Sequence, residues 1–166
     1  MEPLISSVAA FIAYFESIRR RTLQFVAQVP PERMDWAPRA GEFTCGEIVR
    51  HLAAGEAMFV GAVVEGRWMY RGHEAGPADL AGAVAALAAG HAAALDRLRT
   101  LPDAALAEHR PSLDGPPIRA WRLLMAMVEH EIHHRSQLAM YLMLLGVQPP
   151  HIYGLGVEDV IARATG

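Results

Sequence analysis

The sequence is most informative from Met125 to Gly146, which reads MAMVEHEIHHRSQLAMYLMLLG. Its apolar residues recur at helical spacing, and positions four apart are neighbours on one face of a helix. His130 and His134 can therefore direct two imidazoles at one point, as a helix does when it offers two ligands to a metal. Buried histidines are costly without partners and repel each other when protonated. A metal ion would remove both problems, so the stretch predicts a metal site on a buried helix.

A third histidine, His51, lies in another apolar, helix-patterned segment. Gly55 follows one turn later on the same face and leaves space beside an imidazole. Three neutral nitrogen ligands with a position left open are typical of a reactive metal site rather than a structural one. His133 is interpreted as an alternate or outer-shell group, and His91 as a hydrogen-bonded core histidine or a pocket-lining residue. Histidines in the predicted joints are treated as incidental: His73, His109 and His151.

Four long helical patterns, separated by joints rich in proline and glycine, account for most of the chain. They run over Leu4–Gln28, Thr44–Val64, from Pro77 through Leu98, and from after Pro117 to Leu145, with a short helix over Val157–Arg163. Thr44 and Glu47 match a capping box, and Gly146 supplies a C-terminal stop. No segment alternates with period two over a useful length. We expect an all-α protein, an up-down four-helix bundle with a short C-terminal helix, formed as a single domain by residues 1–166.

The last long helix is apolar on two sides. Taking about 100° per residue, His130 shares its side with several residues and Ile132 lies on the opposite one. The first side carries Leu123, Met127, His134, Gln137 and Tyr141, and the second carries Val128, Ala139 and Met143. A helix that is apolar all round is buried all round. A partner subunit is the simplest cover for the second side, so we expect a homodimer.

Composition excludes several classes of function. The net charge of −3 gives no electrostatic footprint for nucleic acid or an anionic membrane, and the only basic cluster, Arg19–Arg21, is interpreted as a solvated helix face. Cys45 is the only cysteine, which rules out an intrachain disulfide, and it is interpreted as a packing residue. We expect a cytoplasmic protein without a membrane span or signal peptide.

The same stretch also fits the H-E-x-x-H pattern of zinc proteases, in which Glu131 would be the general base. The extended form of that motif needs glycine and histidine where Gln137 and Met140 stand. The chain also lacks a strand pattern for aligning a peptide. Glu158 lies at a distance that could supply a further ligand. A zincin-like hydrolase therefore stays a minor alternative.

The chain resembles the DinB-like family of four-helix bundle metalloproteins over essentially its whole length. The matching features are Thr44-Cys45-Gly46-Glu47…His51, His130-x-x-His133-His134-Arg135-Ser136-Gln137-Leu138, Tyr141-Leu142-x-Leu144-Leu145-Gly146, Ile152-Tyr153-Gly154 and Trp36 before a Pro/Gly loop. The family usually has glycine where this chain has Ser136, a position that faces away from the predicted metal site.

The resemblance implies that His51, His130 and His134 bind a divalent metal, with zinc and nickel as the leading candidates, in a protein that is commonly a dimer. Relatives include bacillithiol S-transferases and mycothiol-dependent maleylpyruvate isomerase. The resemblance therefore implies a thiol S-transferase that uses a low-molecular-weight thiol such as bacillithiol and a small-molecule electrophile. The alternative is a metal- or ligand-binding, stress-related bundle without catalysis.

In the transferase reading, the metal would hold the thiol as its nucleophilic thiolate. Gln137 and Tyr141 lie about one and two turns after His134 on the same face and could orient the substrate or a metal-bound water. Glu131 is the third candidate, as a proton acceptor, although it lies about 100° from His130 around the helix.

Overall fold

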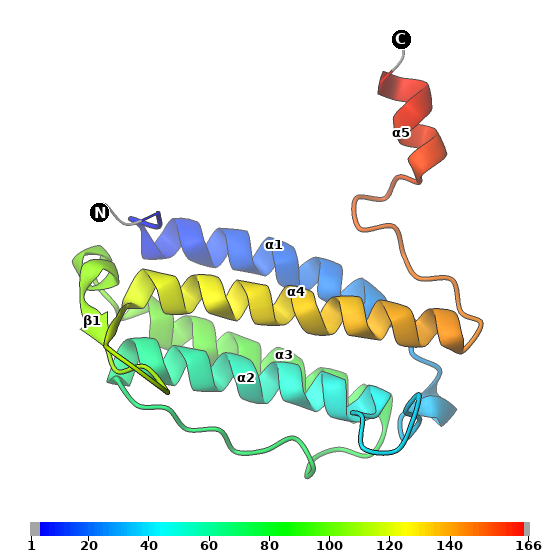
Figure 1. Cartoon of the computed structure of the whole chain (residues 1–166), viewed down its shortest axis with the longest axis horizontal. Helices are drawn as coiled ribbons and strands as arrows, with labels where there is room; N and C mark the ends of the chain where they lie inside the picture. Colours follow the sequence, from blue (N-terminus) through cyan, green and yellow to red (C-terminus); the bar gives the residue numbers. More distant parts are fainter. Residues whose placement is uncertain (1–3, 165–166) are drawn as a thin grey trace.

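The computed structural model describes residues 4–164, which form an all-α bundle with a small hairpin at one end (Figure 1). The elements in chain order are α1 (Val8–Val26), η1 (Pro31–Arg33), α2 (Cys45–Glu65), α3 (Leu80–Arg99), η2 (Asp103–Ala107), β1 (His109–Arg110), β2 (Ile118–Arg119), α4 (Ala120–Leu144) and α5 (Val157–Ala164). The predicted four long helices and short C-terminal helix are confirmed.

The helix starts follow from their caps. The Thr44 side chain accepts from the Glu47 amide while the Glu47 carboxylate accepts from the Thr44 amide, so the predicted capping box opens α2. The prediction that the third helix begins near Pro77 is wrong by about one turn. Asp79 is the N-cap, because its carboxylate accepts from the Gly82 amide.

The end of α4 also agrees with the sequence. Gly146 has a positive φ of 76°, a conformation that glycine adopts without steric cost. The Val147 amide donates to the Leu142 carbonyl and the Gly146 amide donates to the Met143 carbonyl. This pair of bonds is a Schellman motif, which satisfies the last free carbonyls of the helix.

The bundle differs from a simple up-down arrangement in its middle connection. At one end, Arg97 of α3 forms an ion pair with Glu65 of α2. At the other, Arg50 of α2 donates to the Pro77 carbonyl just before α3. The two helices therefore run parallel, and residues 66–79 return along the outside of the bundle (Figure 1). α2 is about 31 Å long. The connector 66–79, when extended, is long enough to span that distance.

α1 and α4 both begin at the end where α3 finishes. The Val8 amide at the start of α1 donates to Asp103 just after α3, and the Ala120 amide at the start of α4 donates to the Glu108 carbonyl. The helix directions are thus up, down, down and up. β1 pairs with β2 directly before α4, so α4 begins at Ala120 rather than directly after Pro117. These two-residue strands were not predicted.

The apolar interior is divided into two clusters by a polar layer. One cluster contains residues from the first half of α1 and the second half of α2, and the other contains the opposite halves. Arg19, Glu56 and Glu131 lie between them and are nearly inaccessible to solvent. The prediction that Arg19 belongs to a solvated face is wrong, since two buried carboxylates face the Arg19 guanidinium.

α5 projects away from the bundle, and no residue of it is buried (Figure 1). The predicted second apolar side of α4 is partly exposed in the single chain: Ile132 is 40% exposed and Met143 is 60% exposed. Within residues 4–164, no helix has the length and apolar character needed to cross a membrane.

Candidate metal centre

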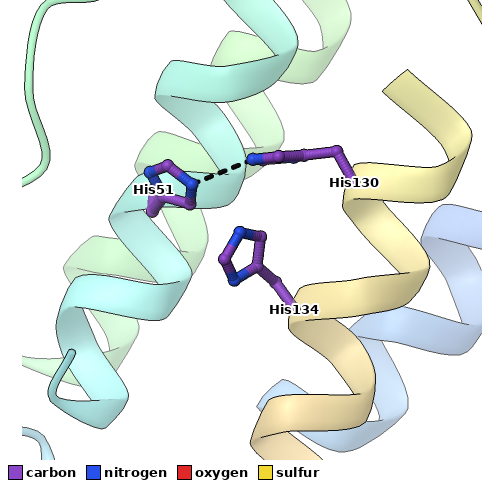
Figure 2. Close-up of side chains that lie close together, drawn as sticks. All are labelled: His51, His130 and His134. Atoms are coloured by element: carbon purple, nitrogen blue, oxygen red, sulfur yellow. Dashed lines mark hydrogen bonds between the residues drawn. The ribbon is translucent and has the colours of Figure 1, made fainter. Parts of the chain in front are cut away.

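Three histidines from two helices meet at the surface between α2 and α4 (Figure 2). His51 comes from α2, and His130 and His134 come from successive turns of α4. One ligand nitrogen from each lies within 4.8 Å of the others. The Nε2 atoms of His51 and His130 are 2.9 Å apart. The sequence-predicted ligand set is therefore brought together by the fold.

Gly55 allows α2 and α4 to approach at this level. A Cβ atom built on Gly55 would lie 2.5 Å from Cε1 of His130, closer than real Cβ contacts come. The predicted role of Gly55 in clearing space for an imidazole is supported, but the ring it accommodates belongs to His130 rather than to His51.

The Gly55→Ala variant is expected to displace the His130 ring while leaving the helix intact, because alanine favours helix more than glycine does. We expect zinc affinity to fall by at least about tenfold, as for other changes that misorient a ligand. Competition with a chromophoric chelator would measure it. Gly90→Ala is the matched control, since a Cβ there meets open space. Equal affinities in the two variants would show that Gly55 does not set the His130 position.

Gln137 determines which ring nitrogen of His134 carries the proton. The Gln137 amide nitrogen donates to the Tyr141 hydroxyl, at 3.2 Å, and the Gln137 amide oxygen lies 2.9 Å from Nδ1 of His134. An amide oxygen only accepts, and Nδ1 of His134 must therefore carry the proton. The lone pair of Nε2 is left for a metal. Trp36 packs edge-on against Tyr141 and helps to hold this chain of contacts.

His51 has a corresponding support that sequence reasoning missed. Its Nδ1 lies 2.6 Å from the Tyr70 hydroxyl, and the same hydroxyl lies 2.6 Å from Nδ1 of His73. The Phe43 ring contacts the rings of His51, His73 and His134. His73 was treated as incidental because it lies in a joint. The alternation of Trp68 and Tyr70 in that joint was the available signal for an ordered, extended segment.

The three histidines are neutral at pH 7. Burial, followed by repulsion from His134, lowers the pKa of His51 to about 4. The same two causes lower the pKa of His130 to about 3. Burial also lowers the pKa of His134, against the opposing effect of its hydrogen bond to Gln137. Neutral imidazoles are the form that binds metals, so few protons need to be displaced.

These shifts predict that the metal-free protein loses stability in mild acid. Unfolded histidines titrate near pH 6.5, whereas His51 and His130 do so near pH 4 and pH 3. Between these values the unfolded chain binds more protons, so the free energy of unfolding falls as the pH falls. The slope is about 1.4 kcal/mol per pH unit for each histidine.

Urea unfolding of chelator-treated protein at pH 7 and pH 5 would measure this effect. The His51→Gln/His130→Gln variant is the control, because it removes both titrating groups. We expect a shallower dependence on pH in the variant. The same dependence in both proteins would contradict the assigned shifts.

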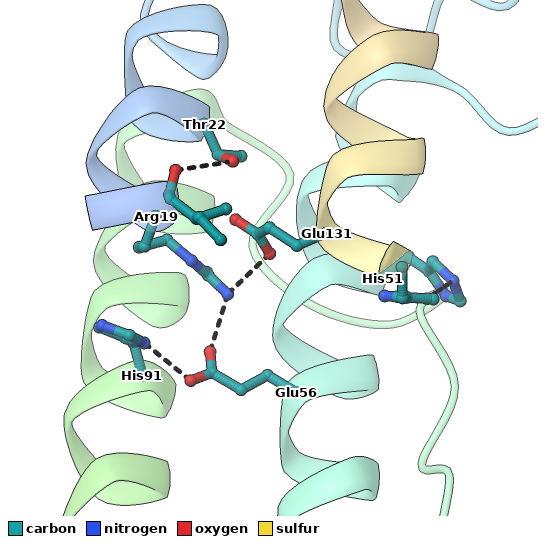
Figure 3. Close-up of polar contacts among 8 residues, drawn as sticks. Arg19, Thr22, His51, Glu56, His91 and Glu131 are labelled. Atoms are coloured by element: carbon teal, nitrogen blue, oxygen red, sulfur yellow. Dashed lines mark hydrogen bonds and ion pairs between the residues drawn. The ribbon is translucent and has the colours of Figure 1, made fainter. Parts of the chain in front are cut away.

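The remaining sequence candidates lie outside the cluster. Glu131 is buried on the inner side of α4 and forms an ion pair with Arg19, so its carboxylate is turned from the histidines (Figure 3). His133 is exposed, although its ring lies beside that of His134. Glu158 is on the projecting α5. Cys45 is buried, as predicted, and burial raises the pKa of its thiol to about 11.

The cluster fits a divalent ion. A tetrahedral ion with bonds of about 2.0–2.1 Å needs nitrogen ligands about 3.3–3.4 Å apart. The observed separations, from 2.9 Å to at most 4.8 Å, bracket that value. Among the described residues, only imidazoles contribute to this cluster. Three neutral protein ligands leave at least one coordination position for a small molecule.

A four-helix bundle with three convergent histidines on its second and fourth long helices defines a class of helical proteins with a candidate metal site. The DinB superfamily model matches residues 14–138, and the chain belongs to this superfamily. No curated protein matches the chain.

Two solved structures of DinB-like proteins support the same fold. A DinB-like protein from Bacillus cereus is 15% identical, with a TM-score of 0.77 over 89% of this chain and 99% of that one. A DinB-like protein from Bacillus subtilis is 20% identical, with a TM-score of 0.71 over 86% and 96% of the two chains. A mycothiol-dependent maleylpyruvate isomerase is 13% identical, with a TM-score of 0.48 over 80% and 60%.

Proposed function

We propose that the protein is a metal-dependent thiol S-transferase. The observation that carries the proposal is the convergence of three neutral imidazoles, His51, His130 and His134, to which residues 4–164 add no fourth ligand. The resemblance to thiol-dependent members of the DinB-like family supports this reading. We further propose zinc or nickel as the ion and a low-molecular-weight thiol such as bacillithiol as the sulfur donor.

A divalent ion held by these histidines would supply a position at which a thiol is bound as its thiolate. Gln137 keeps the proton of His134 on Nδ1. With a metal on Nε2 of His51, the Tyr70 hydroxyl, 2.6 Å from Nδ1, would accept the proton that Nδ1 carries. Phe43 packs against the ring of His51 and Phe59 packs against the ring of His130, so two apolar side chains border the cluster. In the transfer, sulfur forms a bond to the electrophilic carbon, the leaving group departs with its bonding electron pair, and the thiol proton passes to solvent.

The activity would be tested with bacillithiol, glutathione and cysteine as thiols and monobromobimane as the electrophile, with the thioether product measured by mass spectrometry. Coordination is expected to raise the rate at pH 7 by about 30-fold, because a thiol with a pKa near 8.5 is only about 3% thiolate. His134→Ala should lose the enhancement, and the exposed neighbour variant His133→Ala should keep it. A metal-loaded wild type that gives no enhancement with any thiol would contradict the proposal.

One observation favours the second candidate, a metal-binding bundle without catalysis. A cleft of about 650 Å³ lies on the other side of residues 66–79, and none of the three histidines lines it. If the protein is a metal-binding bundle without catalysis, wild type and His133→Ala should both bind metal, and neither should transfer a thiol. The zincin-like alternative has less support, because the carboxylate of Glu131 is bound to Arg19. A casein cleavage assay with and without chelator would test it.

We also infer that the protein is a homodimer, with a second copy covering the outer side of α4. Exposed apolar side chains gather there: Ile132, Met140, Met143 and Leu144. Patches of this kind are uncommon on monomers. Sedimentation equilibrium should give a dimer for wild type and for Ala88→Glu, an exposed control on α3. Ile132→Glu/Met143→Glu should give a monomer. A monomeric wild type would contradict the inference.

A further inference from the structure

A second candidate site lies between α2, α3 and the connector 66–79. It is a cleft of about 650 Å³, within the range typical of small-molecule sites. Its floor consists of small side chains on the two helices, among them Ala54, Ala57, Gly61 and Ala86. None of the three clustered histidines lines it.

Positive charge surrounds this floor. Four arginines line the cleft, Arg50, Arg67, Arg71 and Arg97, against one carboxylate, Glu65. The lining therefore has a formal charge of +3, from four positive and one negative group, in a chain whose net charge is −3. Such a concentration of one sign in a concave surface raises the local concentration of anions.

Two of the arginines already have structural partners. Arg50 donates to the carbonyls of His73 and Pro77 and so ties the connector to α2. Arg97 forms an ion pair with Glu65. The exposed side chains of Arg67 and Arg71 have no ion-pair or hydrogen-bond partner among residues 4–164. These two guanidinium groups are available to a ligand.

The connector 66–79 lies between this cleft and the histidine cluster, and its successive side chains point alternately to one and to the other. Arg67, Met69 and Arg71 line the cleft. Trp68 packs against Phe59, and Tyr70 contacts His51. Successive side chains of an extended chain point to opposite sides. The cleft and the histidine cluster are thus separate sites on the two faces of one segment.

We propose that the cleft binds a small organic anion, with its apolar part on the alanine floor and its carboxylate or phosphate group against Arg67 and Arg71. Guanidinium groups pair with both anions through two parallel hydrogen bonds. The small floor residues leave room for a planar or acyl body. This site goes beyond the proposed transferase function and does not depend on a metal.

Equilibrium dialysis with 2-naphthyl phosphate, 2-naphthoate and uncharged 2-naphthol would test the proposal, since the three probes share one apolar body. We expect at least one anion to bind tenfold or more tightly than 2-naphthol. The tighter anion identifies the group that the site prefers. Arg67→Gln/Arg71→Gln should lower its affinity at least tenfold, as should Ala57→Trp, which fills the floor.

Two controls keep this result separate from the histidine site and from general charge. Arg99→Gln/Arg122→Gln removes two arginines outside the cleft and should leave binding unchanged. His134→Ala should also bind the anion normally, even where it fails to bind metal. Thermal unfolding would confirm that each variant is folded. Equal binding of 2-naphthol, or unchanged anion affinity in Arg67→Gln/Arg71→Gln, would overturn the proposal.

Discussion

The His134→Ala variant is expected to bind zinc more than about 100-fold more weakly than wild type, because even the loss of a partner that only orients a ligand costs 10–100-fold. Only His51 and His130 would remain, on different helices. The substitution also removes the group that Gln137 orients through its hydrogen bond to Nδ1. His51→Ala and His130→Ala should have comparable effects, because each removes one of three equivalent ligands.

Metal content after dialysis, measured by mass spectrometry on untagged protein, would test this expectation, with chelator competition to give affinities. His133→Ala is the matched control, since it removes an exposed imidazole from the same turn of α4. Metal retained by His51→Ala but lost from His134→Ala would remove His51 from the ligand set and strengthen the hydrolase alternative.

The Arg19→Met variant is expected to lose about 3–5 kcal/mol of stability, the typical cost of removing one partner from a buried ion pair. Nη2 of Arg19 lies 2.8 Å from a Glu56 oxygen and 3.0 Å from a Glu131 oxygen (Figure 3). The other Glu56 oxygen lies 2.7 Å from Nδ1 of His91. The network joins all four long helices, and Arg19→Met would leave two carboxylates buried.

The protonation state of Glu131 depends on its ion pair with Arg19. Burial raises the pKa of its carboxyl group, and the charge of Arg19 opposes the rise. Without Arg19, we expect Glu131 to take up a proton and to remain a poorly satisfied group, since one of its oxygens already lacks a partner among the described residues.

Chemical unfolding would measure the loss. Arg20→Met is the matched control, because Arg20 is the exposed neighbour and should change stability by less than about 0.5 kcal/mol. Arg19→Met/Glu56→Gln/Glu131→Gln should regain part of the loss, because no charge is then left unpaired. Arg19→Met with wild-type stability would show that the three groups are not an interacting network.

Much of the candidate site was predictable because its signals are local. The spacing of His130 and His134 fixes their common face on any helix, and the capping box at Thr44 fixes where α2 begins and thus the level of His51. Gly55 pointed to a close approach of an imidazole. These features depend on positions within one helix, which the 3.6-residue period determines.

The parts that escaped prediction depend on contacts between distant segments. The parallel course of α2 and α3 follows from a connector that runs the length of the bundle. The alternation of Trp68 and Tyr70 indicates an extended segment there, but it does not determine where that segment packs. Tyr70 and His73 reach His51 only because of that course. Arg19 looked like part of a surface charge run, since its buried partners are 37 and 112 residues away.

The central claim is that His51, His130 and His134 together hold a divalent ion with a position left open. The X-ray absorption spectrum of the zinc-loaded wild-type protein tests it most directly. We predict three imidazole nitrogens at about 2.0–2.1 Å, one further oxygen or nitrogen, and a sulfur at about 2.3 Å once the thiol is added. A hydrated ion with fewer than three imidazole ligands would contradict the account.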